Sequence, residues 1–343
     1  MRTEKAEADW SRVQLHIVTG KGGTGKSTVA AALALSLASQ GRNVLLCEVE
    51  GRQGIAQMFD VEPLPYEERK IATGLPTPGQ ATPGSVFALH IDAESALLEY
   101  LAMYYKLGRA GRALDKFGVI DFATTIAPGV RDVLLTGKVY EAAKEGRKKG
   151  TSSKQGAHYD AIVLDAPPTG RITQFLGVNS ELAGLAKVGP IKGQADTVMT
   201  LFRSPRTRVH LVTVLEEMPV QETADGIAEL RAAELPVGAV IVNLVRPQDL
   251  TPEQLSAIRE DTVDRERIAA DLLQAGIGAD DELIESLLTE ARDHAERRAL
   301  EDSQRRVVEQ LDAPSFELPR LAGGVDLGGL YELAGALREQ GLR

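Results

Sequence analysis

The sequence predicts an α/β fold, a mostly parallel and doubly wound sheet that carries an inserted helical subdomain. Continuous apolar runs such as 43–49 and 159–164 alternate with helical patterns, as is typical of strands buried on both faces of a parallel sheet. A glycine-rich loop stands between an apolar run at 13–18 and an alanine- and leucine-rich stretch at 29–38. Two acidic strand ends lie more than a hundred residues apart. A simple crossover needs about 30 residues, so an insertion between them is expected.

The glycine-rich loop has the pattern of a phosphate-binding loop, with a glycine, four residues and then Gly-Lys-Ser between a strand and a helix. Glycines let successive backbone N–H groups face an anion, and the following helix directs its positive end at the phosphates. An ordinary glycine turn is the alternative. The loop predicts a P-loop NTPase fold in which ATP or ADP is bound by Gly20, Gly22, Gly23, Thr24, Gly25, Lys26, Ser27 and Thr28.

Two side chains of the loop have predicted chemical roles. Lys26 is expected to bind the β- and γ-phosphates, and the Ser27 hydroxyl to bind Mg²⁺. The helix expected after the loop spans 27–40 and stops at Gly41.

The strand predicted at 43–49 ends beside two carboxylates, Glu48 and Glu50. Because the carboxyl ends of strands converge on the nucleotide in such folds, both are expected near Mg²⁺ and the γ-phosphate. The alternative is that they are charges preceding a helix at 54–59.

The next part of the chain predicts the inserted subdomain. Residues 60–85 are rich in Pro and Gly and are expected to form a loop, followed by a strand at 86–91. The pattern over 93–145 is almost wholly helical. Its apolar side chains either line a groove for a client protein or pack on the sheet, and packing is favoured.

These patterns divide the chain into four parts. A loose N-terminal tail is expected over 1–12, and the ATPase core over 13–91 and 159–343. The helical insert occupies 92–146. A short, basic, exposed linker is expected over 147–158.

A third strand, at 159–164, runs directly into Asp165-Ala166-Pro167-Pro168-Thr169-Gly170. An acidic residue that ends an apolar strand in a phosphate-loop protein is the usual partner of Mg²⁺ and its waters, so Asp165 is predicted in that role. The Pro-Pro-Thr-Gly segment is expected to form a stiff loop in which Gly170 presents its N–H to the γ-phosphate.

The remaining elements complete the sheet. Strands are expected at 209–215 and 237–245 around a helix at 220–234, and Asn243 carries an amide suited to reading an adenine edge. The stretch 249–310 is charged and helical with glycine breaks. A last strand at 316–321 precedes a closing helix at 327–337.

Composition restricts the classes of partner. Acidic residues number 49 against 39 basic ones, a net charge of −10, which argues against a broad nucleic-acid surface. No apolar run is long enough to span a bilayer and no signal peptide opens the chain, so stable membrane insertion is not expected and a cytoplasmic location is. Cys47 is the only cysteine, so a cysteine-based zinc site is not expected.

The form Lys21-Gly-Gly-Thr-Gly-Lys26-Ser-Thr resembles the deviant Walker A loop of one class of P-loop ATPases. In that class the extra lysine reaches the phosphates of the partner subunit. The resemblance therefore implies that Lys21 acts across a dimer interface.

More of the chain resembles the family of arsenite-pump ATPases and ATPases that target tail-anchored proteins. The resemblance covers Asp165 to Gly170, the Pro128-Gly129 turn, Pro219 to Thr223, Ile241-Val-Asn243 and Leu318-Pro319. It implies that Asn243 and Pro319 contact adenine. The implied catalytic set is Lys21, Lys26, Glu50 and Asp165, with Mg²⁺ held by Ser27 and, through water, by Asp165.

The sequence departs from that family at informative points. Glu50 stands where the family has the aspartate that orients the attacking water, and the longer side chain shifts the carboxylate enough to affect turnover. The cysteines that bind zinc or arsenite are absent. The leading interpretation is an ATP-hydrolysing homodimer, or heterodimer with a paralogous ATPase, whose nucleotide state moves the helical insert, with a protein client as a further partner. The alternative is a slowly hydrolysing or non-hydrolysing nucleotide-sensing subunit that acts with a paralogous chain.

Overall fold

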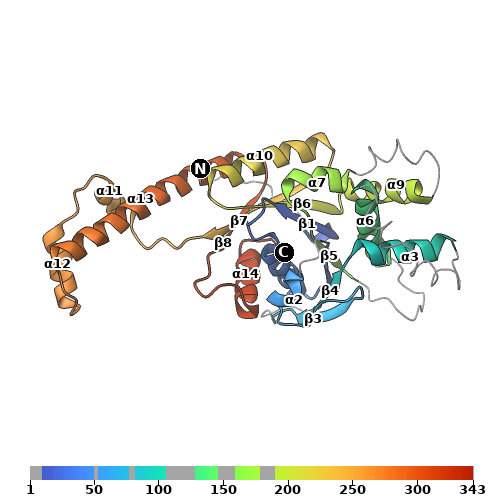
Figure 1. Cartoon of the computed structure of the whole chain (residues 1–343), viewed down its shortest axis with the longest axis horizontal. Coiled ribbons are helices and arrows are strands. Elements are labelled where there is room, and N and C mark those ends of the chain that lie inside the picture. The colour runs from blue at the N-terminus through green and yellow to red at the C-terminus, as the bar shows by residue number, and fades with distance from the viewer. Residues whose placement is uncertain are drawn as a thin grey trace.

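The computed structural model describes residues 10–49, 53–76, 82–105, 128–145, 159–177 and 190–342. Figure 1 shows a sheet with helices on both faces and a helical arm that projects from one side. The predicted linker at 147–158 lies outside the described residues.

The sheet has eight strands in the order β3-β4-β2-β5-β1-β6-β7-β8. Every neighbouring pair is parallel except β3 and β4, so the predicted, mostly parallel α/β fold is confirmed. The strands are β1 (Leu15–Gly20), β2 (Val44–Glu48), β3 (Arg69–Thr73), β4 (Ser85–His90), β5 (Ala161–Asp165), β6 (Thr207–Thr213), β7 (Val237–Val245) and β8 (Ser315–Pro319).

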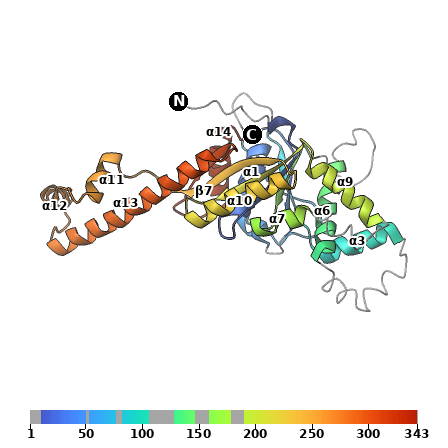
Figure 2. The ribbon, with the colours of Figure 1, turned by 90° about the horizontal axis from the view of Figure 1, so that it is seen from above.

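Helices cover both faces, as a doubly wound sheet requires, and each face has its own apolar core (Figure 2). One core contains side chains of α1 (Lys26–Ala38), α2 (Gly54–Met58) and α14 (Leu327–Glu339). The opposite core is formed with α6 (Pro128–Glu145), α7 (Thr169–Leu176), α9 (Pro190–Phe202), α10 (Glu217–Ala232) and the end of α13 (Asp281–Gln310).

The central strands are apolar throughout because neither face meets solvent. All residues of β1, β2 and β5 are buried, which accounts for their continuous apolar runs. Cys47 lies in β2, and burial raises the pKa of its thiol, so the side chain behaves as an inert apolar group.

Two predictions about the edges of the core are wrong. Residues 60–85 were expected to be loop, but β3 pairs there as an antiparallel edge strand with largely exposed side chains. Edge strands carry polar residues and need no apolar run, so the pattern gave no signal. The loose tail was expected over 1–12, and this is wrong for its last three residues, because Trp10–Arg12 form a 3-10 helix and Trp10 is 6% exposed against the core; residues 1–9 lie outside the described residues.

The predicted helical insert contributes α3 (Ala93–Tyr105) and α6 to the described structure, and the two helices pack against each other. Leu97 is 6% exposed, and Leu135 and Val139 lie in the apolar core. Leu97 therefore packs on the protein itself, whereas for the apolar side chains from Tyr100 to Leu107, of which the structure does not describe the burial, the choice between packing and a client groove stays open. The segment between the two helices lies outside the described residues.

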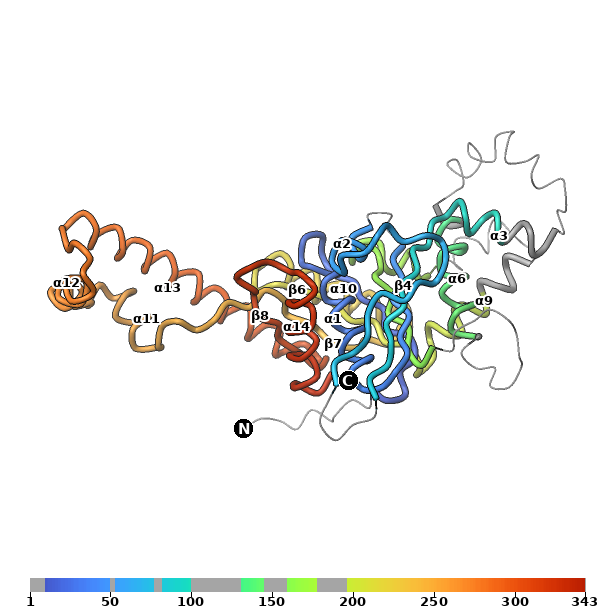
Figure 3. The backbone as a smooth tube through the Cα atoms, turned by 90° about the horizontal axis from the view of Figure 1, so that it is seen from below, coloured from blue at the N-terminus to red at the C-terminus, as the bar shows by residue number. Residues whose placement is uncertain are grey.

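A second helical projection was not anticipated. Helices α11 (Pro252–Arg259), α12 (Arg265–Gln274) and the first part of α13 extend beyond the edge strand β8, and we call this segment the arm (Figure 3). Each of the three helices begins with a side-chain cap, from Thr251, Asp264 and Asp280. No helix within the described ranges is both long and apolar enough to cross a bilayer.

Two histidines lie side by side inside the sheet on β1 and β6. His16 Nδ1 is 3.1 Å from His210 Nε2, and their rings stack with centroids 5.3 Å apart. The Ala239 N–H donates to His210 Nδ1 at 3.1 Å, so the proton of His210 lies on Nε2 and donates to His16. Burial lowers the pKa of His16 well below its ordinary value and lowers the pKa of His210 to about 3. Both rings are therefore neutral at pH 7.

This pair is expected to make the protein less stable in mild acid. Both rings take up protons near pH 6.5 in the unfolded chain but not in the folded chain. The free energy of unfolding is therefore highest above about pH 6.5 and decreases as the pH falls below that value. Each ring contributes a slope of about 1.4 kcal/mol per pH unit. Urea unfolding between pH 7.5 and pH 5 measures the slope, and His16→Gln should lower it while His294→Gln on α13 should not. Equal slopes for the parent and His16→Gln would contradict the assignment.

Candidate nucleotide site

The predicted phosphate loop joins β1 to α1 at the carboxyl edge of the sheet. A Cβ atom on Gly20 would lie 2.2 Å from the Val212 carbonyl oxygen, so only glycine lets the loop leave β1 beside β6. Gly25 has φ +85°, and a Cβ there would lie 2.4 Å from Asn243 Nδ2. These glycines therefore set the path of the loop, while Gly22 and Gly23 lie exposed at its tip.

Hydrogen bonds within the loop hold its shape. The buried Thr24 side chain donates from Oγ1 to the Lys21 carbonyl at 2.8 Å, and the Thr24 carbonyl accepts from Asn243 Nδ2 at 2.9 Å. Thr28 Oγ1 lies 3.6 Å from the Met58 sulfur of α2. Lys26, in the first turn of α1, is only half-buried. The loop thus presents a cation and a helix N-terminus toward solvent, a suitable arrangement for phosphate groups.

The lysine predicted to act across a dimer is held within its own chain. Lys21 Nζ donates to Glu222 Oε1 of α10 at 2.7 Å, with side chains 31% and 37% exposed. An ion pair as exposed as this one contributes about 0–1 kcal/mol. Lys21 can therefore leave Glu222 at small cost when a stronger anion is offered.

The two residues predicted to hold Mg²⁺ meet directly. Ser27 Oγ donates to Asp165 Oδ2 at 2.5 Å, joining the start of α1 to the end of β5. Thr19 Oγ1 of β1 donates to the Pro167 carbonyl at 2.7 Å and fixes the segment after Asp165. A hydroxyl beside a 6% exposed carboxylate provides oxygen ligands of the type that Mg²⁺ prefers.

Of the two carboxylates predicted at the end of the second strand, the structure describes only Glu48. Glu50 lies outside the described residues, so its predicted role stays a prediction. Glu48 is 2% exposed, and its Oε1 accepts from the Gly54 N–H of α2 at 2.8 Å. Its Oε2 lies 3.4 Å from His90 Nδ1 and has no hydrogen bond to any residue that the structure describes.

Gly170 does not lie in a stiff loop as predicted, because α7 begins at Thr169 and includes it. The proline pair before it is compatible with a helix start, where missing N–H donors cost nothing. Gly170 is exposed in the first turn of α7, and its sensing role stays a prediction.

The predicted adenine contacts lie at the ends of β7 and β8. Asn243 is 3% exposed and packs on the phosphate loop, while Pro319 is exposed and registers with Val245. Their chain neighbours line a pocket of about 490 Å³ between these strand ends and α13. The adenine contact itself stays a prediction. The pocket is lined by Val214, Leu215, Glu216, Leu244, Val245, Arg246, Arg297, Leu300, Glu301 and Arg320.

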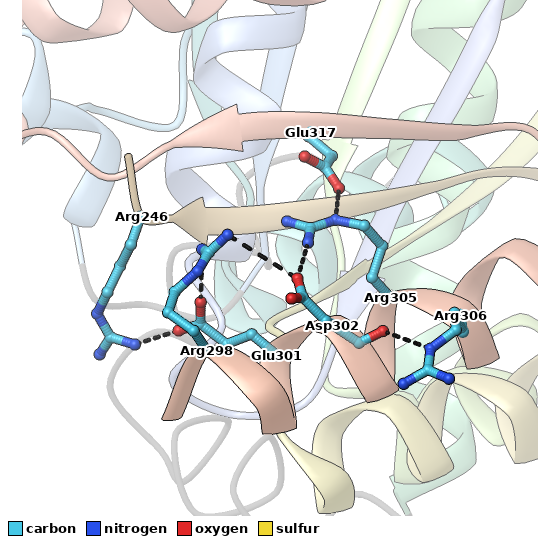
Figure 4. Close-up of polar contacts among 7 residues, drawn as sticks. All are labelled: Arg246, Arg298, Glu301, Asp302, Arg305, Arg306 and Glu317. Carbon is cyan, nitrogen blue, oxygen red and sulfur yellow. Dashed lines mark hydrogen bonds and ion pairs between the residues drawn. The ribbon is translucent and has the colours of Figure 1, made fainter. Parts of the chain in front are cut away.

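Sequence reasoning missed the acidic partners that organise this edge. Glu222 lies in the Pro219–Thr223 stretch that had been noted, but its contact with Lys21 spans two hundred residues. Arg246 follows β7 and pairs with Glu301 of α13, and Arg298 donates to the same carboxylate at 3.0 Å (Figure 4). No local pattern distinguishes these acids from solvated ones.

A phosphate loop, a parallel sheet and a Ser–Asp pair at its carboxyl edge define a P-loop ATPase. The family model described as "Anion-transporting ATPase" matches residues 13–205. The chain belongs to this family of ATPases.

Three relatives of the chain also have names that describe them as ATPases. The chain is 53% identical over 336 residues to "ATPase BagA" of Mycobacterium tuberculosis, which covers 97% of this chain and 95% of the relative. It is 28% identical over 248 residues to an "Arsenical pump-driving ATPase" of Escherichia coli, covering 67% of this chain and 39% of that protein. A "Putative arsenical pump-driving ATPase 2" of Aquifex aeolicus is 25% identical over 273 residues, covering 70% and 83%.

Proposed function

We propose that the chain hydrolyses ATP as a dimer, either with a second copy or with a paralogous ATPase, and that Lys21 acts on the nucleotide of the partner. The observation that carries this proposal is the weak contact of Lys21 with Glu222, in which both side chains are about one-third exposed. A lysine at the outer edge of the phosphate loop, held at little cost, is free to exchange a carboxylate for a phosphate.

Mg²⁺ fits the donor set beside the loop. Ser27 Oγ and Asp165 Oδ2 lie 2.5 Å apart, and hydroxyl and carboxylate oxygens together suit a small hard cation. When bound, Mg²⁺ neutralises charge that develops on the phosphate oxygens. Ser27 would hold it directly and Asp165 through water, while Lys26 and the loop N–H groups would orient the phosphates.

The same geometry offers a route from the nucleotide to the helical insert. α7 starts four residues after Asp165 and packs against α6, which packs against α3. A shift of the segment after Asp165 would therefore move α7 and with it the insert. We propose that this movement is the output of the ATPase cycle and that a protein client is its target.

The test measures ATP turnover per chain over a range of protein concentrations. Turnover is expected to rise as chains associate, because Lys21 then completes the partner's site. Lys21→Ala should remove this rise, whereas Glu222→Gln, which frees Lys21 without deleting it, should keep it. Lys26→Ala provides the background.

Two other outcomes of the turnover measurement would contradict parts of this proposal. Turnover that does not depend on concentration would contradict the action of Lys21 in trans. Nucleotide binding without turnover at any concentration would favour the regulatory subunit, which would then require the paralogous chain for hydrolysis.

A further inference from the structure

Three polar side chains occupy matched positions at the carboxyl edge of adjacent strands. His90 of β4 is the register partner of Glu48 of β2, and Glu48 is the register partner of Asp165 of β5. Register partners on neighbouring parallel strands place their side chains on the same face of the sheet. Asp165 contacts Ser27 of α1 and Glu48 contacts Gly54 of α2, so both carboxylates face the helices on that side.

The two carboxylates are buried side by side. Glu48 is 2% exposed and Asp165 is 6% exposed. Neighbouring strands lie about 4.8 Å apart, so two carboxyl groups in register are close enough for one hydrated cation to lie between or above them. Burial of a carboxylate is unfavourable unless a hydrogen bond or a cation compensates it.

One oxygen of Glu48 has a structural task and the other does not. Oε1 accepts from the Gly54 N–H at 2.8 Å and so anchors the first turn of α2. Among the residues that the structure describes, Oε2 is buried without a hydrogen bond, and its contact with His90 Nδ1 at 3.4 Å lacks hydrogen-bond geometry. An anchor for α2 requires only the first oxygen, so the second is available to a ligand.

We propose that Glu48 is a second acidic residue of the Mg²⁺ site, where it holds water molecules of the ion opposite Asp165. This inference rests on the proposed Mg²⁺–nucleotide site and adds to it a residue on β2. Mg²⁺ keeps several of its waters in proteins and is bound by one or two carboxylates, which matches a pair on adjacent strands. Because Glu48 also bonds Gly54, it ties the ion to the start of α2.

The test is Mn²⁺ binding to the ADP-loaded full chain, followed by the electron paramagnetic resonance signal of free Mn²⁺, and it requires no turnover. Glu48→Gln retains an oxygen for the Gly54 N–H and removes the charge. Its Mn²⁺ affinity is expected to fall about 10- to 100-fold, as for other residues that support metal ligands. ADP affinity measured in EDTA should stay at the parental value.

Two further variants separate metal binding from anchoring. Glu48→Asp keeps the charge beside Asp165 and withdraws the oxygen from Gly54, so it should bind Mn²⁺ more tightly than Glu48→Gln although it unfolds more easily. Glu62→Gln is the matched control, because the Glu62 side chain is 83% exposed, and should bind Mn²⁺ like the parent.

Specific results would overturn the proposal. If Glu48→Gln binds Mn²⁺ as tightly as the parent, or more tightly than Glu48→Asp, then Glu48 serves only to anchor α2. The first of these results overturns this inference alone, whereas a parent chain that binds ADP but no Mn²⁺ also overturns the proposed Mg²⁺ site at Ser27 and Asp165. A parent chain that binds no ADP overturns the proposed function together with it.

Discussion

Lys26→Ala is expected to lower ATP turnover about a hundredfold to a thousandfold, the usual loss when one charged or hydrogen-bonding group that stabilises a transition state is removed. Lys26 lies half-buried in the first turn of α1, so its ammonium and the helix N-terminus would both act on phosphates bound at the loop. Alanine is a strong helix former, so the substitution removes the cation while α1 remains intact. Phosphate release under saturating ATP and Mg²⁺ measures the loss.

The matched control for this prediction is Lys70→Ala. Lys70 is exposed on the edge strand β3, and its removal changes the net charge of the chain equally. Its turnover should equal that of the parent. If Lys26→Ala retained parental turnover in the same assay, the phosphate loop would not be the site of hydrolysis.

The second large expected effect is a loss of stability on substitution of Glu301, where α13 meets the end of β7. Glu301 of α13 is 8% exposed, and it accepts from Arg298 at 3.0 Å and pairs with Arg246 at the end of β7 (Figure 4). Arg298 is itself 4% exposed. Removing one partner of a buried pair costs about 3–5 kcal/mol, and the buried Arg298 would keep only its 3.8 Å contact with the half-exposed Asp302, which places the loss at the lower end of that range. Glu301→Gln is therefore expected to lower the free energy of unfolding by about 3 kcal/mol, measured by urea denaturation.

Asp302→Asn is the control for Glu301→Gln, since it makes the same chemical change one residue along α13. The Asp302 side chain is 49% exposed, accepts from Arg305 at 2.8 Å and makes only a longer contact of 3.8 Å with Arg298. Exposed pairs contribute about 0–1 kcal/mol, so its loss should be small. Equal destabilisation by the two variants would show that burial of the Arg298–Glu301 pair does not stabilise the arm.

Glu301 also lines the pocket between the strand ends and α13. Its pairing with Arg246 therefore connects the arm to the edge of the sheet that carries the candidate nucleotide site. Glu301→Gln should for this reason loosen the orientation of the arm as well as the fold, since Arg246 follows directly on β7.

Local patterns were sufficient for the elements that lie in the core. The strands β1, β2 and β5 are buried on both faces, so their apolar runs identified them without any tertiary information. The phosphate loop was equally clear, because its glycines and lysines are adjacent in the chain. Likewise Ser27 and Asp165 were both predicted from strand and helix ends, and they meet at 2.5 Å.

Other features had no local signal. β3 was missed because an edge strand needs no apolar pattern. The stretch that contains α11 and α12 was expected to be helical, but its projection as an arm depends on how α13 leaves the sheet. Trp10 is buried because its ring packs against the rings of His210 and Phe316, with centroids 5.5 Å and 6.3 Å away, and these residues are distant in the sequence.

The sequence by itself determined the fold class, the ATPase family and the position of the predicted phosphate loop, since each depends on residues adjacent in the chain or on the period of burial. Only the tertiary structure decided which groups the carboxylates contact and which of them are buried. It brought Glu222 to Lys21, placed Glu48 in register with Asp165 and buried Glu301 between two arginines. The physical reason is that the sequence pattern around an acidic residue is the same whether its side chain is solvated by water or paired with another charge. Only its burial and its neighbours in the fold distinguish these two cases.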